Sequence, residues 1–249
     1  MKENGMFQAD EKNAYLVSHV DEAVANGWIR VYYQPIYDAL SRNVFAFEAL
    51  ARWADPALGL MAPDEFTPVL ENAYLLYKID LFVLEQACRE IQRRRKQGGA
   101  MYASINLSRK DLDIPDFHER VNALVDRYEV PHGAISFELA ETALVKHEDA
   151  IRRHIAAFHE DGYRVWLDDF GSGYNSLNAL QHFDFDFMKI DRRFLQKSTD
   201  GTKDVLSDIG FPKLAIAINH KIFRPAHLPC ANPLKVTWLC IFPFKSAGR

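Results

Sequence analysis

Apolar runs and amphipathic stretches alternate along most of this chain. Short runs rich in branched and aromatic residues predict strands over residues 28–37, 44–53, 102–108, 135–142, 164–169 and 187–191. Between them, helices are predicted from 63, over about 79–97, over 117–128, over 148–161 and from about 176. In the longest of these helices, Ile79, Val83 and Ala87 recur every four residues, which predicts one buried face.

This alternation of strands and helices predicts an α/β protein built on a parallel sheet. The chain has 249 residues, 48% of them hydrophobic, which is enough for one large core. A TIM-type (β/α)8 barrel of roughly 250 residues fits this length, and an open doubly wound sheet is the alternative. Pro35 in the first strand indicates an edge or an irregular pairing, because proline donates no ladder hydrogen bond.

Polar residues stand late in five of these strands. They are Glu48, Asn106, Glu138, the pair Asp168 and Asp169, and Lys189. In a TIM-type barrel such positions converge on the face where active sites are built. Each residue also has a purely structural explanation: the aspartates as an Asx-turn that caps a helix, Glu48 as an ion pair with Arg52, and Lys189 as an ion pair with Asp169 or Asp191.

The donor atoms in this set indicate a hard cation. Carboxylate and amide oxygens, without thiolate or imidazole, select Mg²⁺ or Mn²⁺. Two such ions can clamp an in-line attack at phosphorus. Lys189 is placed to orient the attacking water or to neutralise charge on the phosphate. The sequence therefore predicts a metal site suited to phosphoryl chemistry.

Several motifs in order resemble those of the EAL-domain family, over about residues 28–200. They are Gln34-Pro35-Ile36, Glu48-Ala49-Leu50-x-Arg52, Asn106, Glu138-x-x-Glu141, Asp168-Asp169-Phe170-Gly171-Ser172-Gly173-Tyr174 and Lys189-Ile190-Asp191. Proteins of that family are bacterial cyclic-di-GMP phosphodiesterases on a modified TIM barrel whose first strand runs antiparallel.

The resemblance implies a role for each matching residue. Glu141 would support the loop beside Glu138, and the product would be linear pGpG. The metal ligands would be Glu48, Asn106, Glu138, Asp168 and Asp169, with Mg²⁺ or Mn²⁺ as cofactor. Lys189 would assist the attacking water, so that Lys189, Glu48 and Asp168 form the catalytic set. Leu50 and Arg52 would contact cyclic-di-GMP, Arg52 at a phosphate, and Gln34 would line the site.

The chain departs from the family pattern after the last predicted strand. The family continues there with a helix, a seventh strand ending in Glu-Gly-Val-Glu and an eighth strand region, whereas the last glutamate of this chain is Glu160. Residues 211–249 hold no Asp or Glu but six Lys or Arg and five of the 11 prolines. We therefore expect a helical lead-in over 1–27, an EAL-type barrel domain over 28–210 that is incomplete after strand six, and a divergent tail over 211–249.

The origin and role of this tail are open at this point. The abrupt change of composition predicts a shift of reading frame between about Val205 and Pro212. Alternatively, the apolar runs at 214–218 and 236–242 pair with the open edges of the sheet as substitute strands. Without the seventh-strand ligand, we expect impaired hydrolysis of cyclic-di-GMP. The alternatives are a non-catalytic module that binds cyclic-di-GMP or a protein partner, and a disrupted gene product.

Composition narrows the classes of partner. A formal charge of −4 predicts no binding to DNA or RNA polymers, and Arg93 to Lys96 are interpreted as a solvated helix end. Residues 1–12 resemble neither a signal peptide nor a membrane span, so a cytoplasmic protein is expected. Three cysteines without Cys-x-x-Cys and nine histidines without His-Glu-x-x-His predict neither disulfides nor a zinc motif. A homodimer is suggested only by analogy with the family.

Overall fold

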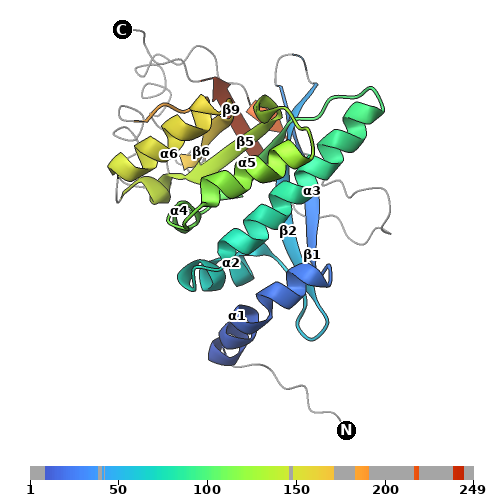
Figure 1. Cartoon of the computed structure of the whole chain (residues 1–249), viewed down its shortest axis with the longest axis vertical. Coiled ribbons are helices and arrows are strands. Elements are labelled where there is room, and N and C mark those ends of the chain that lie inside the picture. Colours follow the sequence, from blue (N-terminus) through green and yellow to red (C-terminus); the bar gives the residue numbers. More distant parts are fainter. Residues whose placement is uncertain are drawn as a thin grey trace, which may run out of the picture.

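The chain folds into a mostly parallel sheet, and helices α3, α5 and α6 lie in front of its strands in the view of Figure 1. This computed structural model describes residues 9–38, 41, 43–145, 148–170, 183–190, 216–218 and 238–243. The helices are α1 Ala9–Ala25, α2 Pro63–Asn72, α3 Leu76–Lys96, α4 Arg109–Leu112, α5 Phe117–Arg127 and α6 Glu148–Glu160, with 3-10 turns at His132–Ala134 and Glu141–Val145. The strands are β1 Ile29–Tyr37, β2 Val44–Asp55, β3 Gly59–Met61, β4 Ala103–Leu107, β5 Ile135–Ala140, β6 Arg164–Phe170, β7 Phe187–Ile190, β8 Ile216–Ile218 and β9 Trp238–Pro243.

The strand order is β1-β2-β4-β5-β6-β7-β9-β8, with β3 paired to β2. Neighbouring strands from β2 to β7 run parallel, and β1 runs antiparallel to β2. The six predicted strands, the parallel sheet and the antiparallel first strand are thus confirmed. Pro35 lies in β1, whose ladder partner among the described residues is β2 alone, as expected for an edge strand. The predicted helix from about Ser176 falls outside the described residues.

The tail supplies two strands to this sheet. β9 pairs antiparallel with β7, with Lys189 opposite Ile241, and β8 pairs antiparallel with β9. The two apolar runs therefore act as substitute strands on the β7 side. β8 lies close to β1, but no ladder joins the two among the described residues, so the barrel is left incomplete.

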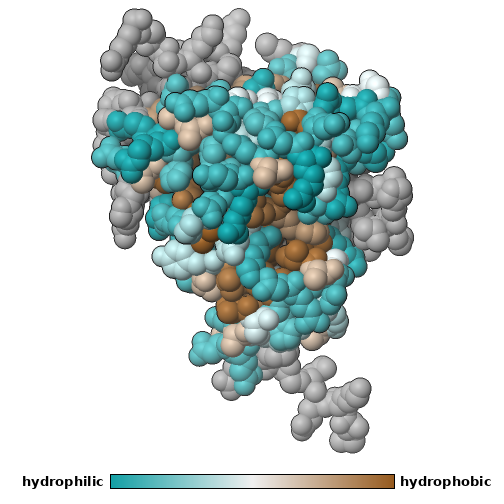
Figure 2. Space-filling model, viewed as in Figure 1, coloured by the Kyte–Doolittle hydropathy of each residue, from teal (hydrophilic) through white to brown (hydrophobic). Residues whose placement is uncertain are grey.

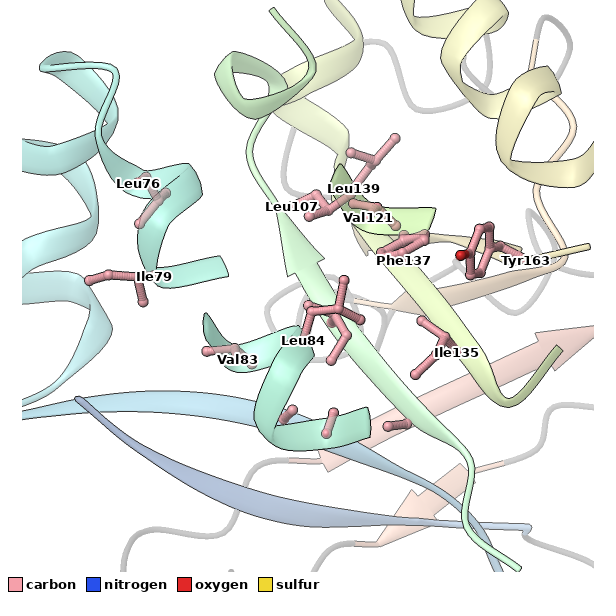
Figure 3. Close-up of a cluster of buried hydrophobic side chains, with 14 of the residues drawn as sticks. Leu76, Ile79, Val83, Leu84, Leu107, Val121, Ile135, Phe137, Leu139 and Tyr163 are labelled. Carbon is pink, nitrogen blue, oxygen red and sulfur yellow. The ribbon is translucent and has the colours of Figure 1, made fainter. Parts of the chain in front are cut away.

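Side chains alternate in direction along each strand, so the two faces of the sheet lie in different environments. In β5, Ile135, Phe137 and Leu139 pack on the helices in the main core, and the residues between them, Ser136 and Glu138, face the inside of the curved sheet. Figure 3 shows side chains of α3 and the β4 and β5 strands meeting in this core. A second, smaller cluster, formed by Ile36, Ala46 and Trp166, lies apart from the main core. The strands β1, β2 and β6, which carry the site residues described below, also supply this cluster.

Asp55 ties α1 to the β2–β3 hairpin, which sequence patterns did not predict. Its carboxylate accepts hydrogen bonds from the Tyr15 hydroxyl at 3.2 Å, the Trp53 indole at 3.1 Å, and the backbone amides of Ala57 and Leu58. The side chain is 4% exposed, so four donors compensate the burial of one charge. A single polar residue thus fixes both the turn and the docking of α1.

The basic residues at the end of α3 are mostly exposed, as interpreted from the sequence, and two of them also pair with a buried carboxylate. Arg93 and Arg94 both pair with Glu90, at 2.6 and 2.8 Å, and Glu90 is only 9% exposed. The Arg94 guanidinium also lies 4.9 Å from the centre of the Phe47 ring. These cations therefore neutralise a buried carboxylate, besides lying where the helix dipole favours positive charge. No helix in the described part of the chain is long and apolar enough to span a membrane.

Candidate metal and active site

Four parallel strands bring three carboxylates and one amine into a single buried cluster. One oxygen from each of Glu48 on β2, Glu138 on β5 and Asp168 on β6 lies within 4.8 Å of the other two. Lys189 on β7 donates hydrogen bonds to Glu138 at 2.6 Å and to Asp168 at 3.3 Å, and it forms an ion pair with Glu48 at 3.1 Å. The four side chains are between 0 and 19% exposed. We call these four residues the carboxylate–lysine cluster.

The ion pairs differ from the structural alternatives considered for the sequence. Glu48 pairs with Lys189 and Asn106, and its expected alternative partner Arg52 instead donates to the Ala51 carbonyl at 2.6 Å. Lys189 pairs with carboxylates of three other strands, and Asp191, one of its alternative partners, lies outside the described residues. A lysine that bridges three strands inside a sheet orders the site in a way that a single surface ion pair does not.

Burial and crowding change the acidity of this cluster. Burial raises the pKa of Glu138 to about 8, and the charges of Glu48 and Asp168 add to that rise, while Lys189 opposes it. Burial alone would lower the pKa of Lys189, but the three carboxylates outweigh it and raise that pKa well above its ordinary value. Below about pH 8 the lysine is therefore charged and Glu138 carries a proton. Above that pH, three carboxylates around one ammonium leave an excess of negative charge that a divalent cation can neutralise.

A further observation indicates that these donors suit a divalent cation. The Oε1 atom of Glu138 is buried and has no hydrogen-bond partner among the described residues. An unpaired buried carboxylate oxygen is costly unless it binds a cation or a proton. The Nδ2 amine of Asn106 donates to Glu48 at 3.2 Å, so its amide oxygen takes no part in that bond. The predicted metal role of this oxygen stays a prediction.

The other predicted site residues lie at different places around the cluster. Gln34 is 7% exposed and stands opposite Glu48 in the β1–β2 ladder. Asp169 is exposed, has a positive φ of 55°, and lies outside the three-carboxylate group. Glu141 is buried, in the turn that follows β5. The metal role of Asp169 and the loop role of Glu141 stay predictions.

A cavity of about 460 Å³ lies beside the carboxyl ends of β2, β4 and β5. Leu50 and Asn106 line it from the strands, and Phe66, Glu71 and Asp80 line it from α2 and α3. Hydrophobic residues also show on the outer surface near α2 and the adjoining part of α3, on a face that is otherwise mainly hydrophilic (Figure 2). Sequence reasoning missed Asp80, because a single carboxylate beside the apolar stripe of a predicted helix gives no sign that it will border a cavity.

Asp80 and Asp111 share a hydrogen bond at the edge of this cavity. Burial, reinforced by Asp111 and Glu71, raises the pKa of Asp80 well above its ordinary value, and burial raises that of Asp111 to about 6. Asp111 also accepts from the Ser108 amide at 2.7 Å, as part of a capping box that starts α4. Asp80 is therefore the protonated partner that donates to Asp111.

Arg52 is a half-buried cation without an ion pair among the described residues. It lies four residues after Glu48 on β2, so both side chains are on one face of that strand. Burial lowers its pKa, which the charges of Tyr32, Asp64 and Glu48 partly oppose. Its guanidinium makes no other hydrogen bond to the described residues, so its remaining donors can bind an anionic ligand at this end of the strand.

Comparison with known proteins agrees with this geometry. A model of the EAL domain matches residues 18–208, well over half of the chain. The chain belongs to the EAL-domain family. Cyclic di-GMP phosphodiesterase RocR of Pseudomonas aeruginosa is 29% identical to this EAL chain over 181 residues, which are 73% of the chain and 46% of RocR. An uncharacterized protein of Mycobacterium tuberculosis is 30% identical over 199 residues, 79% of the chain and 32% of that protein.

Solved EAL structures share the fold. The PaMucR phosphodiesterase in complex with c-di-GMP superposes with a TM-score of 0.69 at 26% identity, covering 78% of each chain. The EAL enzyme Bd1971, with cAMP and cyclic-di-GMP bound, gives a TM-score of 0.70 at 28% identity and covers 82% of this chain and 57% of that one. These neighbours confirm the TIM-like barrel class. The chain spans about a third or less of the first curated relatives that it matches.

Proposed function

We propose that this EAL chain binds cyclic-di-GMP together with Mg²⁺ or Mn²⁺ and hydrolyses it to pGpG only slowly. The observation that carries the proposal is the carboxylate–lysine cluster, in which Glu48, Glu138 and Asp168 converge around Lys189 beside a cavity. Relatives named as cyclic-di-GMP phosphodiesterases, and structures solved with that dinucleotide, support the choice of ligand.

Each residue of the site has a defined part in this proposal. Glu48, Asn106, Glu138, Asp168 and Asp169 would hold the metal, which supplies a Lewis acid and an activated water at the scissile phosphate. The ammonium of Lys189 holds a positive charge at the carboxylates and is the donor that orients the attacking water. Glu138 must lose its proton when the cation enters, since metal and proton compete for the same oxygen.

The cavity suits a guanine base. Its volume of about 460 Å³ exceeds what one base requires, and Leu50 and Phe66 offer apolar contacts to a flat ring. Glu71 and Asp80 line the cavity with carboxyl oxygens, which pair well with the N1–H and amino donors of guanine. Arg52 is placed for a phosphate of the same ligand, because a guanidinium binds phosphate oxygens through two parallel hydrogen bonds.

Calorimetry with cyclic-di-GMP tests the binding part. We expect Arg52→Ala to weaken binding by about tenfold or more, the worth of a charge-assisted phosphate contact of roughly 1.5–3 kcal/mol. Arg152→Ala, an equal loss of charge at an exposed position of α6, is the matched control and should leave the affinity unchanged. Equal affinities of the Arg52→Ala variant and the unaltered chain would show that the pocket lies elsewhere.

Slow hydrolysis is proposed because the chain has no glutamate beyond Glu160. On the side of β7 that faces away from β6, the neighbouring strand is β9, whose sequence Trp-Leu-Cys-Ile-Phe-Pro contains no carboxylate. Losing one ligand of a two-metal site at a cost on the order of 3 kcal/mol reduces the rate about a hundredfold. Chromatographic assay of pGpG with Mg²⁺ or Mn²⁺ tests this. A turnover of about 10 s⁻¹, ordinary for enzymes, would refute slow hydrolysis, and binding without any pGpG would favour the non-catalytic module.

A further inference from the structure

Strands β1 and β2 form a long antiparallel pair (Figure 1), and one face of this pair carries residues of the site. Along the ladder Tyr32 stands opposite Leu50, and Arg30 stands opposite Arg52. Opposed residues of an antiparallel pair point to the same face, and so do residues two apart on one strand. Because Glu48 lies on this face of β2, Arg30 and Tyr32 share the face of the carboxylate–lysine cluster.

Burial along β1 agrees with this assignment of its two faces. Ile29, Val31 and Tyr33 belong to the main core, whereas Arg30 is exposed and Tyr32 is half-buried between them. The core therefore takes the odd-numbered side chains in this part of the strand. The even-numbered side chains stand on the side where a ligand can reach them.

The opposed pair of Arg30 and Arg52 is electrostatically unfavourable in the protein by itself. Like charges directly opposite each other in an antiparallel ladder, with Cβ atoms on the order of 5 Å apart, destabilise the pairing of the strands. Arg30 forms no ion pair and no side-chain hydrogen bond with the residues that the structure describes. An anion placed between the two guanidinium groups would remove their repulsion.

Arg52 is the better ordered member of this pair. Its guanidinium carbon lies 6.0 Å from the centre of the Tyr32 ring, and its Nη1 donates to the Ala51 carbonyl at 2.6 Å. A cation over an aromatic ring is held by the negative face of that ring. Tyr32 therefore orients Arg52 from the neighbouring strand, while Arg30 lies beside both on the exposed end of the same face.

The pair lies at the rim of the cavity beside the cluster. Leu50 and Ala51, which precede Arg52 on β2, both line that cavity. A cyclic dinucleotide has two phosphodiester groups, and only the one at the metal is cleaved, so the other must be held elsewhere. Each of its two non-bridging oxygens can accept hydrogen bonds from a guanidinium group.

We propose that Arg30 joins Arg52 in a two-arginine clamp for the phosphate of cyclic-di-GMP that is not hydrolysed. The clamp rests on the proposed function, because it takes cyclic-di-GMP as the ligand. It adds a binding residue on β1 to the contacts made from β2. The phosphate neutralises two opposed cations, so the ligand stabilises the β1–β2 pairing as it binds.

Calorimetry with cyclic-di-GMP in Mg²⁺ tests the clamp on the full chain. We expect Arg30→Gln to weaken binding about three- to tenfold, which is less than the effect of Arg52→Ala because Arg30 is exposed. Arg30→Lys keeps the charge but loses the planar fork, so it should recover only part of the affinity. Arg152→Gln, at an exposed position of α6, is the matched control and should bind as the parent chain does.

Two further measurements separate a clamp from a structural role of Arg30. If both arginines bind one phosphate, the loss in the double variant Arg30→Gln/Arg52→Gln should be smaller than the product of the two single losses. Without ligand, Arg30→Gln should leave the midpoint of thermal unfolding unchanged or raise it, because a like-charge contact is removed. A residue that served only the fold would lower that midpoint.

The possible outcomes distinguish the clamp from the function on which it rests. Parental affinity in Arg30→Gln, together with weaker binding in Arg52→Ala, would overturn the clamp and leave the proposed function standing. A parent chain that does not bind cyclic-di-GMP would overturn both. Weaker binding in Arg30→Gln with a lower unfolding midpoint, or with single losses that multiply in the double variant, would also overturn the clamp.

Discussion

The two neighbours of strand β7 differ in direction and in chemistry. β6 runs parallel to β7 and carries Asp168, which reaches Lys189 at 3.3 Å. β9 runs antiparallel and has no acidic or basic residue between Trp238 and Pro243. Both satisfy backbone groups of β7, but only β6 adds a carboxylate to the cluster. Covering an edge and completing a site are therefore separate requirements, because the first needs any paired backbone and the second needs one side chain at one position.

The largest effect on this difference between the two sides of β7 is expected when the charge that β7 contributes is removed. Lys189→Met leaves three buried carboxylates without their cation, so we expect the free energy of unfolding to fall by about 3–5 kcal/mol in EDTA. Mn²⁺ should restore part of this loss by replacing the ammonium charge. Urea denaturation with and without Mn²⁺ measures both effects.

Lys78→Met is the matched control for that experiment, because Lys78 pairs with the exposed Asp21. A surface ion pair contributes about 0–1 kcal/mol. If Lys189→Met cost no more than this control, the cluster would be an ordinary surface-like ion pair, and the assignment of a buried, charge-crowded site would be wrong.

A proline in β9 tests whether this strand only covers the edge of β7 or also shapes the site. Ile241→Pro removes the amide of the residue opposite Lys189, so we expect a loss of roughly 1–3 kcal/mol in unfolding free energy. The Mn²⁺ affinity should stay within about threefold, since β9 supplies no ligand. Ile105→Pro, in the central strand β4, is the contrasting variant and should prevent folding. A Mn²⁺ affinity that collapses in Ile241→Pro, in a chain that circular dichroism shows to be folded, would mean that β9 shapes the site.

A smaller effect of pH is expected where α6 meets the residues before β7. His159 bonds Asp186 at 3.0 Å, which raises the pKa of His159, and Asp186 also accepts from the Val165 amide at 2.7 Å. Burial opposes ionisation of Asp186, but the bonds from His159 and Val165 outweigh it and lower its pKa. The stabilisation by His159 is full below its unfolded pKa of about 6.5 and is lost as pH rises through the higher folded value.

The contribution of Asp186 has the opposite sign, because its folded pKa is depressed. It is present above about pH 4 and is lost as pH falls through the folded value. The pair therefore stabilises most between about pH 4 and 6.5. His159→Gln should lower the unfolding free energy by at most about 1 kcal/mol at pH 5.5, since both groups are partly exposed, and by less at pH 8.5. Equal losses at the two pH values would exclude a charged pair.

The strands could be predicted from the periodicity of apolar residues, and their charged ends from the position of polar residues after apolar runs. Glu48, Glu138 and Asp168 each follow apolar runs, and parallel strands must bring such ends to one edge of the sheet. The separate placement of Asp169 follows from the same alternation, since adjacent residues of a strand face opposite ways, together with its left-handed backbone.

Other features leave no local pattern. The three residues of β3 and four of α4 are too short for a periodic signal, and their positions depend on Asp55 and on the Ser108 cap. The direction of β9 cannot be read from an apolar run, because antiparallel and parallel strands share that pattern. His118 on α5 contacts Asp161, which follows α6, so no spacing motif joins them. Such contacts arise from tertiary packing alone.

Titration of Mn²⁺ into the full chain, followed by the loss of the free-ion electron paramagnetic resonance signal, tests the central claim most directly. We predict stoichiometric binding at pH 8 that weakens at least tenfold in Glu138→Gln, because the buried carboxylate at the centre of the cluster is lost. Binding should also weaken as pH falls below about 8, since Glu138 then holds a proton. Mn²⁺ binding that is absent, or that is equal in Glu138→Gln and the unaltered chain, would contradict the account.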